Sequence, residues 1–281
     1  MVLKQVVATG ASEGKEADPL PESIATDIKK DFGTEAISKD SQKKHQTRGE
    51  LRFLMVDRKM KSLEDLQEPK KISIDLPAAK IEKDLEVFRR LAIELGAVDA
   101  AIVSTDEIII DERVRAKCMY PKCAFYGNNI HCPPHAPDLD FIRKLVERYA
   151  YGILFGVRGD PKDFVGPDFL KRVGRKNCAK TIVNTVCSEI ESRAFYEGYH
   201  LALAFGQGPC KSYWCPDQPC AALGEEKACR FSLKARSSVE AVGIDAYSMA
   251  TRKGWEVYPC GARVEPEKIP HVLLIGLILI L

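Results

Sequence analysis

The C-terminal stretch Val272-Leu-Leu-Ile-Gly-Leu-Ile-Leu-Ile-Leu281 says most about the fold of this chain. It carries no charge, and Gly276 is its one residue without a branched aliphatic side chain. A helix needs about 20 residues to cross a bilayer, so the run is too short for a span. Short continuous apolar runs are typical of strands buried on both faces. We therefore expect a buried central strand over residues 272–280, with a membrane-surface anchor as the alternative.

Helical and strand patterns alternate upstream of this strand. A helix is expected to begin at Asp75 as its N-cap, with Pro77 in the first turn and Gly96 just past its end. Further helices are expected over residues 138–149, 180–196 and 239–252, and further strands over residues 100–104, 108–111, 152–157, 201–205 and 255–258. This alternation predicts an α/β or α+β fold in which a mixed sheet is flanked by helices.

Residues 1–70 differ in composition from the rest of the chain. They are rich in Lys, Glu, Asp, Ser and Gln and poor in aromatic residues. Such a segment buries too little apolar surface to offset the entropy cost of folding. We expect a charged, disordered or loosely packed extension over residues 1–70, with short helices over residues 21–32 and 62–67. The cysteine-rich domain is expected over residues 71–281.

The charge balance and the apolar runs exclude some classes of function. A formal net charge of +2 provides no basic field for binding nucleic acid. The apolar stretch at the start is too short for a signal peptide, and no run reaches the length of a membrane span. The sequence therefore predicts a cytoplasmic protein that has no transmembrane span and binds no nucleic acid.

Seven of the ten cysteines fall into two arrays with matching spacing. In each array four residues separate the first two thiols and eight separate the next two, and one further thiol precedes the second array by four residues. The first array is Cys118, Cys123 and Cys132, and the second is Cys210, Cys215, Cys220 and Cys229. Prolines and glycines form turns around them, which lets distant thiolates converge on one centre. We expect two cysteine-rich metal-binding loops, residues 118–137 and 210–230, in a reducing and anaerobic cell, and we expect both loops to leave the C-terminal ends of strands.

The spacing bears on which metal these loops hold. Structural zinc sites favour pairs of ligands separated by about two to four residues, and three evenly spread thiolates do not form two pairs. Iron–sulfur clusters accept several spacings, often with proline after a ligand, as at Cys132 and Cys215. We expect one or two 4Fe–4S clusters, with zinc as the alternative.

The two arrays differ in the number of thiols. The second offers a full set for one cubane cluster, whereas the first lacks a fourth ligand. His131, His135 or Cys260 is a candidate for this ligand, or the position is open to a substrate. Of the remaining thiols, Cys187 is expected in the core and Cys178 on the surface.

Residues beside the thiols are candidates for cofactor binding. Arg115 and Arg230 could offset the charge of a cluster, with ordinary surface charge as the alternative interpretation. Tyr126 could orient a cluster or a substrate, although turn chemistry is the simpler interpretation of the stretch that also holds Asn128 and Asn129. Glu240 and Asp245 could act as acid or base, but a cap or a salt bridge is the preferred interpretation of each.

Several stretches around the loops match a known pattern: Arg115-Ala-Lys-Cys118, Cys123-Ala-Phe-Tyr126-Gly127, Cys132-Pro133-Pro134, Gly208-Pro209-Cys210, Cys229-Arg230 and Ser238-Val-Glu240-Ala-Val-Gly243-Ile244-Asp245. They closely resemble a family of archaeal and bacterial proteins described as predicted metal-binding proteins. The resemblance runs from about residue 80 to the C-terminus and implies a metal role for the seven cysteines. The chain departs from the family in the wider spacing before Cys215 and in the absence of a proline after Arg230.

These features predict an iron–sulfur redox protein of undetermined substrate. It would transfer electrons or catalyse a reaction at a three-cysteine cluster, and a redox partner protein is expected. The alternatives are a zinc-stabilised interaction module and a protein that delivers metal or clusters. The sequence specifies neither an oligomeric state nor whether the protein is an enzyme.

Overall fold

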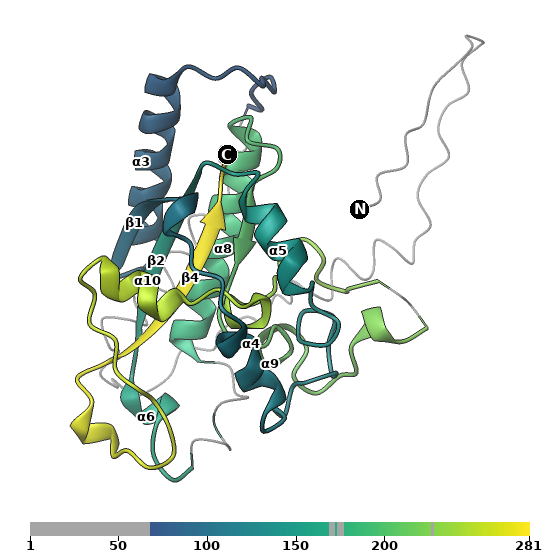
Figure 1. Cartoon of the computed structure of the whole chain (residues 1–281), viewed down its shortest axis with the longest axis vertical. Coiled ribbons are helices and arrows are strands. Elements are labelled where there is room, and N and C mark those ends of the chain that lie inside the picture. Colours follow the sequence, from purple (N-terminus) through teal and green to yellow (C-terminus); the bar gives the residue numbers. More distant parts are fainter. Residues whose placement is uncertain (1–67, 169–171, 173–176, 226–227) are drawn as a thin grey trace, which may run out of the picture. The chain divides into compact units, whose positions relative to one another are not determined.

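Strand β4 (Val272–Leu279) lies between β2 and β3 in a sheet of order β1-β2-β4-β3 (Figure 1). The structure is a computed structural model that describes residues 68–168, 172, 177–225 and 228–281. Every residue of β4 is buried. The expectation of a buried central strand at the C-terminus is confirmed.

The other elements are labelled as in Figure 1. The helices are α3 (Ala78–Glu94), α4 (Glu112–Met119), α5 (Leu139–Val146), α6 (Pro161–Phe164), α8 (Cys178–Tyr196), α9 (Lys211–Trp214) and α10 (Ala246–Arg252). The strands are β1 (Asp99–Ser104), β2 (Tyr151–Gly159) and β3 (Leu203–Phe205). Short 3-10 helices are η2 (Thr105–Glu107), η3 (Ala221–Leu223), η4 (Glu240–Val242) and η5 (Pro266–Lys268).

Each pair of neighbouring strands in the described sheet is antiparallel, where a mixed sheet was expected. β2 and β4 pair over eight positions, with Ile153 opposite Ile278 and Phe155 opposite Gly276. Gly276 leaves room for its cross-strand neighbour, since a Cβ there would stand 2.4 Å from Cζ of Phe155. Helices pack on both faces of this sheet, so the α+β alternative of the predicted fold class is confirmed.

The alternation of side chains along β4 divides the core into two clusters. Val272, Leu274 and Ile278 join the cluster formed with α3 and α8. The residues between them face the opposite side, where α5, η4 and α10 supply the partners, and they are Leu273, Ile275, Leu277 and Leu279. Because both faces of β4 are covered, its burial requires both helical layers.

Some local predictions were wrong. The N-cap of α3 is Pro77 and not Asp75. Residues 108–111 form no strand but a single bridge, from Ile110 to Ile244, and residues 255–258 form no strand because no neighbour pairs with them. The helix expected over residues 239–252 is two pieces, because the left-handed conformation of Gly243 ends η4 before Asp245 caps α10.

The predictions for residues 1–67, including the two short helices, lie outside the described residues. Among the helices that the structure describes, none is long and apolar enough to cross a membrane.

Residues 237–245 join the two cysteine loops to the sheet. On one side, Asp111 N–H donates to the carbonyl of Gly243 at 2.8 Å, and α4 packs against η4. On the other side, Gly206 N–H donates to the carbonyl of Ser237 at 3.0 Å. This segment therefore contacts both the helix that leads to the first array and the turn that leads to the second.

Replacing Gly243 tests whether the junction formed by residues 237–245 depends on the close approach of the backbone to its neighbours. Its φ is +77°, and a Cβ there would stand 2.4 Å from Leu139 Cδ2. We expect Gly243→Ala to lower the free energy of unfolding by about 2–4 kcal/mol, from backbone strain together with overpacking.

The matched control is Gly254→Ala. Gly254 also has a positive φ, +79°, but nothing lies within 4 Å of the added Cβ. Backbone strain alone predicts a loss of about 1 kcal/mol. Equal losses for both variants in urea-unfolding experiments would contradict the packing explanation.

Candidate metal centre

The first array lies at the end of α4 and in the turns that follow it. Asp111 caps α4 by accepting a hydrogen bond from Arg113 N–H at 2.7 Å, and Cys118 stands in the last turn. Cys123 N–H then donates to the Cys118 carbonyl at 3.0 Å. Gly127, in the left-handed conformation, folds the loop back on Pro133 through a 2.7 Å backbone bond. The predicted loop thus begins from a helix and not from a strand.

The second array begins directly after β3. Cys210 starts the short helix α9, where its carbonyl accepts from Trp214 N–H at 2.8 Å. The aromatic rings of Trp214 and Phe231 stack at 5.4 Å between centroids, so the start and end of the loop lie together. Arg236 anchors the end of the loop to α8 through an ion pair with Glu191. Aromatic stacking and this ion pair therefore close the second loop.

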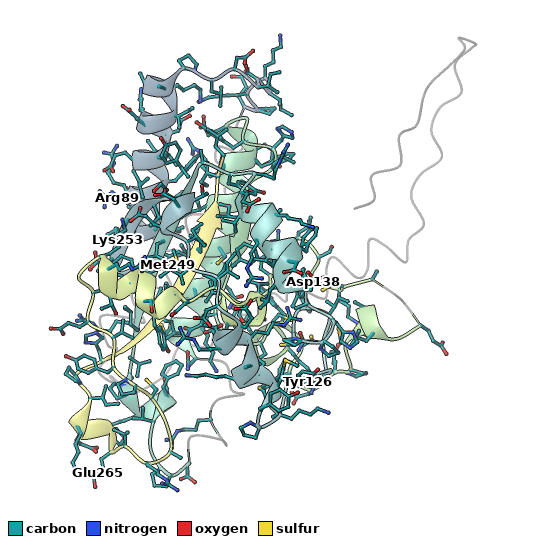
Figure 2. The ribbon with its side chains drawn as sticks, viewed as in Figure 1. Arg89, Tyr126, Asp138, Met249, Lys253 and Glu265 are labelled. Carbon is teal, nitrogen blue, oxygen red and sulfur yellow. The ribbon has the colours of Figure 1, made fainter. Side chains whose placement is uncertain are left out.

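The two arrays meet at Asn129, which is fully buried. Its side-chain oxygen accepts from the backbone N–H of His131 at 3.0 Å and from Sγ of Cys210 at 3.5 Å. Its amide nitrogen has no hydrogen-bond partner among the described residues. In Figure 2, sulfur atoms drawn in yellow lie near the labelled Tyr126, on the stretch after α4. One asparagine thus bridges two loops that are 81 residues apart.

The pKa shifts of the thiols also show that the two arrays lie close together. Burial raises the pKa of Cys118 to about 11, and the nearby thiols of Cys123 and Cys132 add to the rise. Burial also raises the pKa of Cys210, and the thiol of Cys132 is the largest charge effect on it. Because neighbouring thiolates disfavour one another, Cys118 and Cys210 resist ionisation in the metal-free protein, and a bound cation would relieve that repulsion.

A cavity of about 630 Å³ opens beside the first array. Cys118 and Cys123 line it, whereas the thiols of the second array do not. Glu240 lines it too, and its Oε2 atom is buried without a hydrogen-bond partner among the described residues. Burial raises the pKa of Glu240, against hydrogen bonding that lowers it. Glu240 lies in the first turn of η4, whose N-cap is Val239, whereas Asp245 is the N-cap of α10 as expected.

The three residues predicted to bind a cofactor have local partners. Arg115 donates to the carbonyls of Pro137 and Ala136, the latter at 3.3 Å, and so closes the first loop. The Tyr126 ring lies 5.2 Å from the Lys122 ammonium group. Arg230 donates to the Pro219 carbonyl at 3.0 Å. These contacts stabilise the loops, and a role of the three residues in cofactor binding stays a prediction.

The three candidates for a fourth ligand of the first array have different surroundings in the structure. The His131 ring nitrogen Nδ1 lies 3.3 Å from Ser237 Oγ, and burial lowers the pKa of this histidine. His135 is exposed. Cys260 packs against the α3–α8 core, and its thiol donates to the Tyr258 carbonyl at 3.4 Å. The other two thiols outside the arrays lie as expected, with Cys187 buried and Cys178 exposed.

The side chains of the two arrays are of the types that bind metals, but they do not lie close enough together to form a complete metal site. Among the described residues, no group of three or more His, Cys, Asp or Glu side chains is close enough to hold a metal ion. None of the ten cysteines, all of which the structure describes, forms a disulfide, and seven of them lie in the two loops. Free thiols crowded next to an unpaired buried amide suit a soft metal or an iron–sulfur cluster.

These features define a cysteine-rich α+β protein with the donor set of a metal site. A family model described as "Predicted metal-binding protein (DUF2284)" matches residues 101–280. The chain belongs to this family, which confirms the resemblance seen in the sequence. No curated protein and no solved structure matches the chain.

Two residues of this region were undervalued from sequence. Asn129 was interpreted as a turn residue. Glu240 was interpreted as a cap or a salt-bridge partner, although Val239, Ala241 and Val242 beside it are apolar. A carboxylate inside such an apolar run is the signal that indicates burial.

Asn129 provides a test of the junction between the arrays. We expect Asn129→Leu to lower the free energy of unfolding of the metal-free protein by about 1–3 kcal/mol, because it leaves the His131 N–H buried without an acceptor. The anaerobically purified variant should also retain less metal, since Cys210 loses its neighbour.

The control is Asn128→Ala. Asn128 makes one 3.3 Å bond, to the Ala124 carbonyl, and its side-chain oxygen has no partner among the described residues. Its replacement should leave stability and metal content nearly unchanged in urea unfolding and elemental analysis. Equal metal loss in both variants would contradict the assigned role of Asn129.

Glu240 predicts a pH dependence of stability. Its pKa is raised in the folded protein, so ionising it costs free energy that the unfolded chain does not pay. Stability from this group is fully present below the unfolded pKa and is lost as pH rises through the folded pKa. Glu240→Gln should therefore stabilise the metal-free protein at neutral pH, by about 1 kcal/mol or more, and less in acid.

Glu112 predicts the opposite pH dependence of stability. Hydrogen bonds to its own backbone N–H and to Arg143 lower its pKa, so Glu112→Gln should destabilise the protein at neutral pH and not in acid. Urea unfolding across pH measures both variants. A pH-independent effect of Glu240→Gln would show that the carboxyl is solvated.

Proposed function

We propose that this protein binds iron–sulfur clusters through its seven array cysteines and works as a redox protein. The second array, with four thiols, would hold a 4Fe–4S cluster in a closed site. The first array, with three thiols, would hold a cluster with an open position. Metal-binding is the description of the family, and iron–sulfur chemistry is our inference from the thiol count and spacing.

The observation that carries this proposal is the position of the cavity. It is lined by Cys118 and Cys123 of the three-thiol array and by no thiol of the four-thiol array. A cluster with an incomplete ligand set needs room for a further ligand, whereas a fully ligated cluster does not. The array with the smaller thiol count is therefore the one that this cavity reaches.

The proximity of the arrays supports electron transfer between them. The Cys132 thiol raises the pKa of Cys210, and Asn129 contacts Cys210 directly. When bound, the clusters would supply one-electron chemistry. The chain itself binds their iron through the thiolates, excludes water by burying Cys132 and Cys210, and leaves an amide N–H of Asn129 to bond sulfur.

One observation favours delivery of metal or clusters as a second candidate function. Cys123 is exposed, so a ligand of the first array is accessible to an acceptor protein. An electron carrier should keep its cluster through a redox cycle, whereas a delivery protein should pass it on. Zinc remains the alternative metal, and elemental analysis distinguishes it from iron.

Anaerobic purification tests the proposal. We expect iron and acid-labile sulfide in comparable amounts, a broad visible absorption that bleaches with dithionite, and a paramagnetic resonance signal in the reduced state. Cys118→Ser should lower the iron content by about half and spare the second cluster, since it removes a ligand of the first array alone.

The matched control is Cys178→Ser, because Cys178 is an exposed thiol outside both arrays. It should keep the full iron content. A colourless protein that contains zinc and no iron, or equal iron loss in both variants, would contradict the proposal.

A further inference from the structure

The cavity beside the first array has the size and lining of a small-molecule site. Its volume of about 630 Å³ falls within the usual range for such sites, about 300–1,000 Å³. Much of its wall is aliphatic, from Val114, Val239, Ile244, Ala246 and Ile275. An aliphatic wall favours a ligand with an apolar body.

Some polar groups of the wall already have partners. Asp111 caps α4 and pairs with Arg113, whose guanidinium lowers the pKa of that carboxyl to about 2. Asp245 accepts hydrogen bonds from Ser248 N–H at 3.0 Å and from Ser248 Oγ at 2.6 Å. These carboxylates hold the ends of α4 and α10 in place and are not available to a ligand.

Two other polar side chains of the wall bond to each other, and each keeps one atom without a partner among the described residues. Oε2 of Glu240 and Oε1 of Gln207 are both buried without a hydrogen-bond partner. Two buried oxygens that accept hydrogen bonds are costly to leave unpaired. A ligand hydroxyl would satisfy one of them by donating its hydrogen.

Lys117 supplies a positive charge to the same cavity. No hydrogen bond or ion pair within the described part of the chain occupies its ammonium group, and its side chain is exposed. Because Lys117 precedes Cys118, it lies on the helix turn that carries the first thiol. A ligand carboxylate at Lys117 would stand next to the three-thiol array.

We propose that this cavity binds a small 2-hydroxy acid with an apolar body. Its carboxylate would pair with Lys117, its hydroxyl would donate to Gln207 or Glu240, and its apolar part would pack on the aliphatic wall. This inference rests on the proposed function, since it names the substrate class of the three-thiol site. No reaction step is assigned to the ligand.

Calorimetric titration of the full-length, anaerobically purified protein with 3-phenyllactate tests the inference. Two matched compounds separate the contacts: 3-phenylpropionate lacks the hydroxyl, and 3-phenyllactamide lacks the charge. We expect 3-phenyllactate to bind, and each matched compound to bind about 10-fold more weakly, the loss of one hydrogen bond or ion pair.

Variants locate the site. Lys117→Met should weaken binding of 3-phenyllactate about 10-fold and leave 3-phenyllactamide unaffected. Gln207→Leu should weaken 3-phenyllactate and leave 3-phenylpropionate unaffected. Lys122→Met is the control, because Lys122 lies over Tyr126 and does not line the cavity; it should bind like the wild type.

The possible failures are distinguishable. Iron and sulfide analysis of the same sample tests the proposed function, and a sample without iron contradicts that function. An iron-containing sample that binds none of the three compounds overturns the substrate inference alone. So does binding that Lys117→Met and Lys122→Met weaken equally. Lys117 is on the surface, so its replacement tests the site without unfolding the protein.

Discussion

The burial of β4 on both faces is the constraint on which the rest of the structure depends. Its side chains alternate between two core clusters, so helices must cover both sides of the sheet. α3 and α8 supply one layer, and α5, η4 and α10 supply the other. The second layer includes the segment that contacts both cysteine loops. β4 has no chemical role of its own, but its burial determines where the residues with a chemical role lie.

Crowding of thiols is the second element of the account. Thiols within one another's electric field resist ionisation, and burial at Cys118 and Cys210 adds to that resistance. Deprotonation of such a cluster is therefore unfavourable until a cation binds. Hydrogen bonding at the site is also incomplete, because Asn129 and Glu240 each have a buried polar atom without a partner among the described residues. Loops, thiols and unpaired atoms all have a natural explanation in a metal centre.

Much of the fold could be predicted from the sequence, because hydrophobic periodicity determines it. β4, α8 and α5 follow from apolar spacing and, for α5, from Asp138 as a capping residue. The strands predicted over residues 108–111 and 255–258 were wrong, because strand-like composition does not guarantee a neighbouring strand. The close approach of Gly243 to Leu139 joins residues more than 100 positions apart, and no local pattern reports such a contact.

The candidate site divides in the same way. The seven cysteines could be predicted because their spacing is a local property of each loop. Their meeting at Asn129 could not, since it depends on how residues 237–245 join the loops in three dimensions. Burial of Glu240 had a local signal in its apolar neighbours Val239, Ala241 and Val242, but its place in the cavity wall follows from packing. The cavity beside Cys118 is a product of that same packing.

A crystal structure of the anaerobically purified protein, with anomalous scattering recorded at the iron edge, tests the central claim most directly. The account predicts iron density at both arrays, bound by the thiolates of Cys118, Cys123 and Cys132 at one and by the other four at the second. Iron at the first array should face the cavity. Thiols without any metal, or a zinc signal in place of iron, would contradict it.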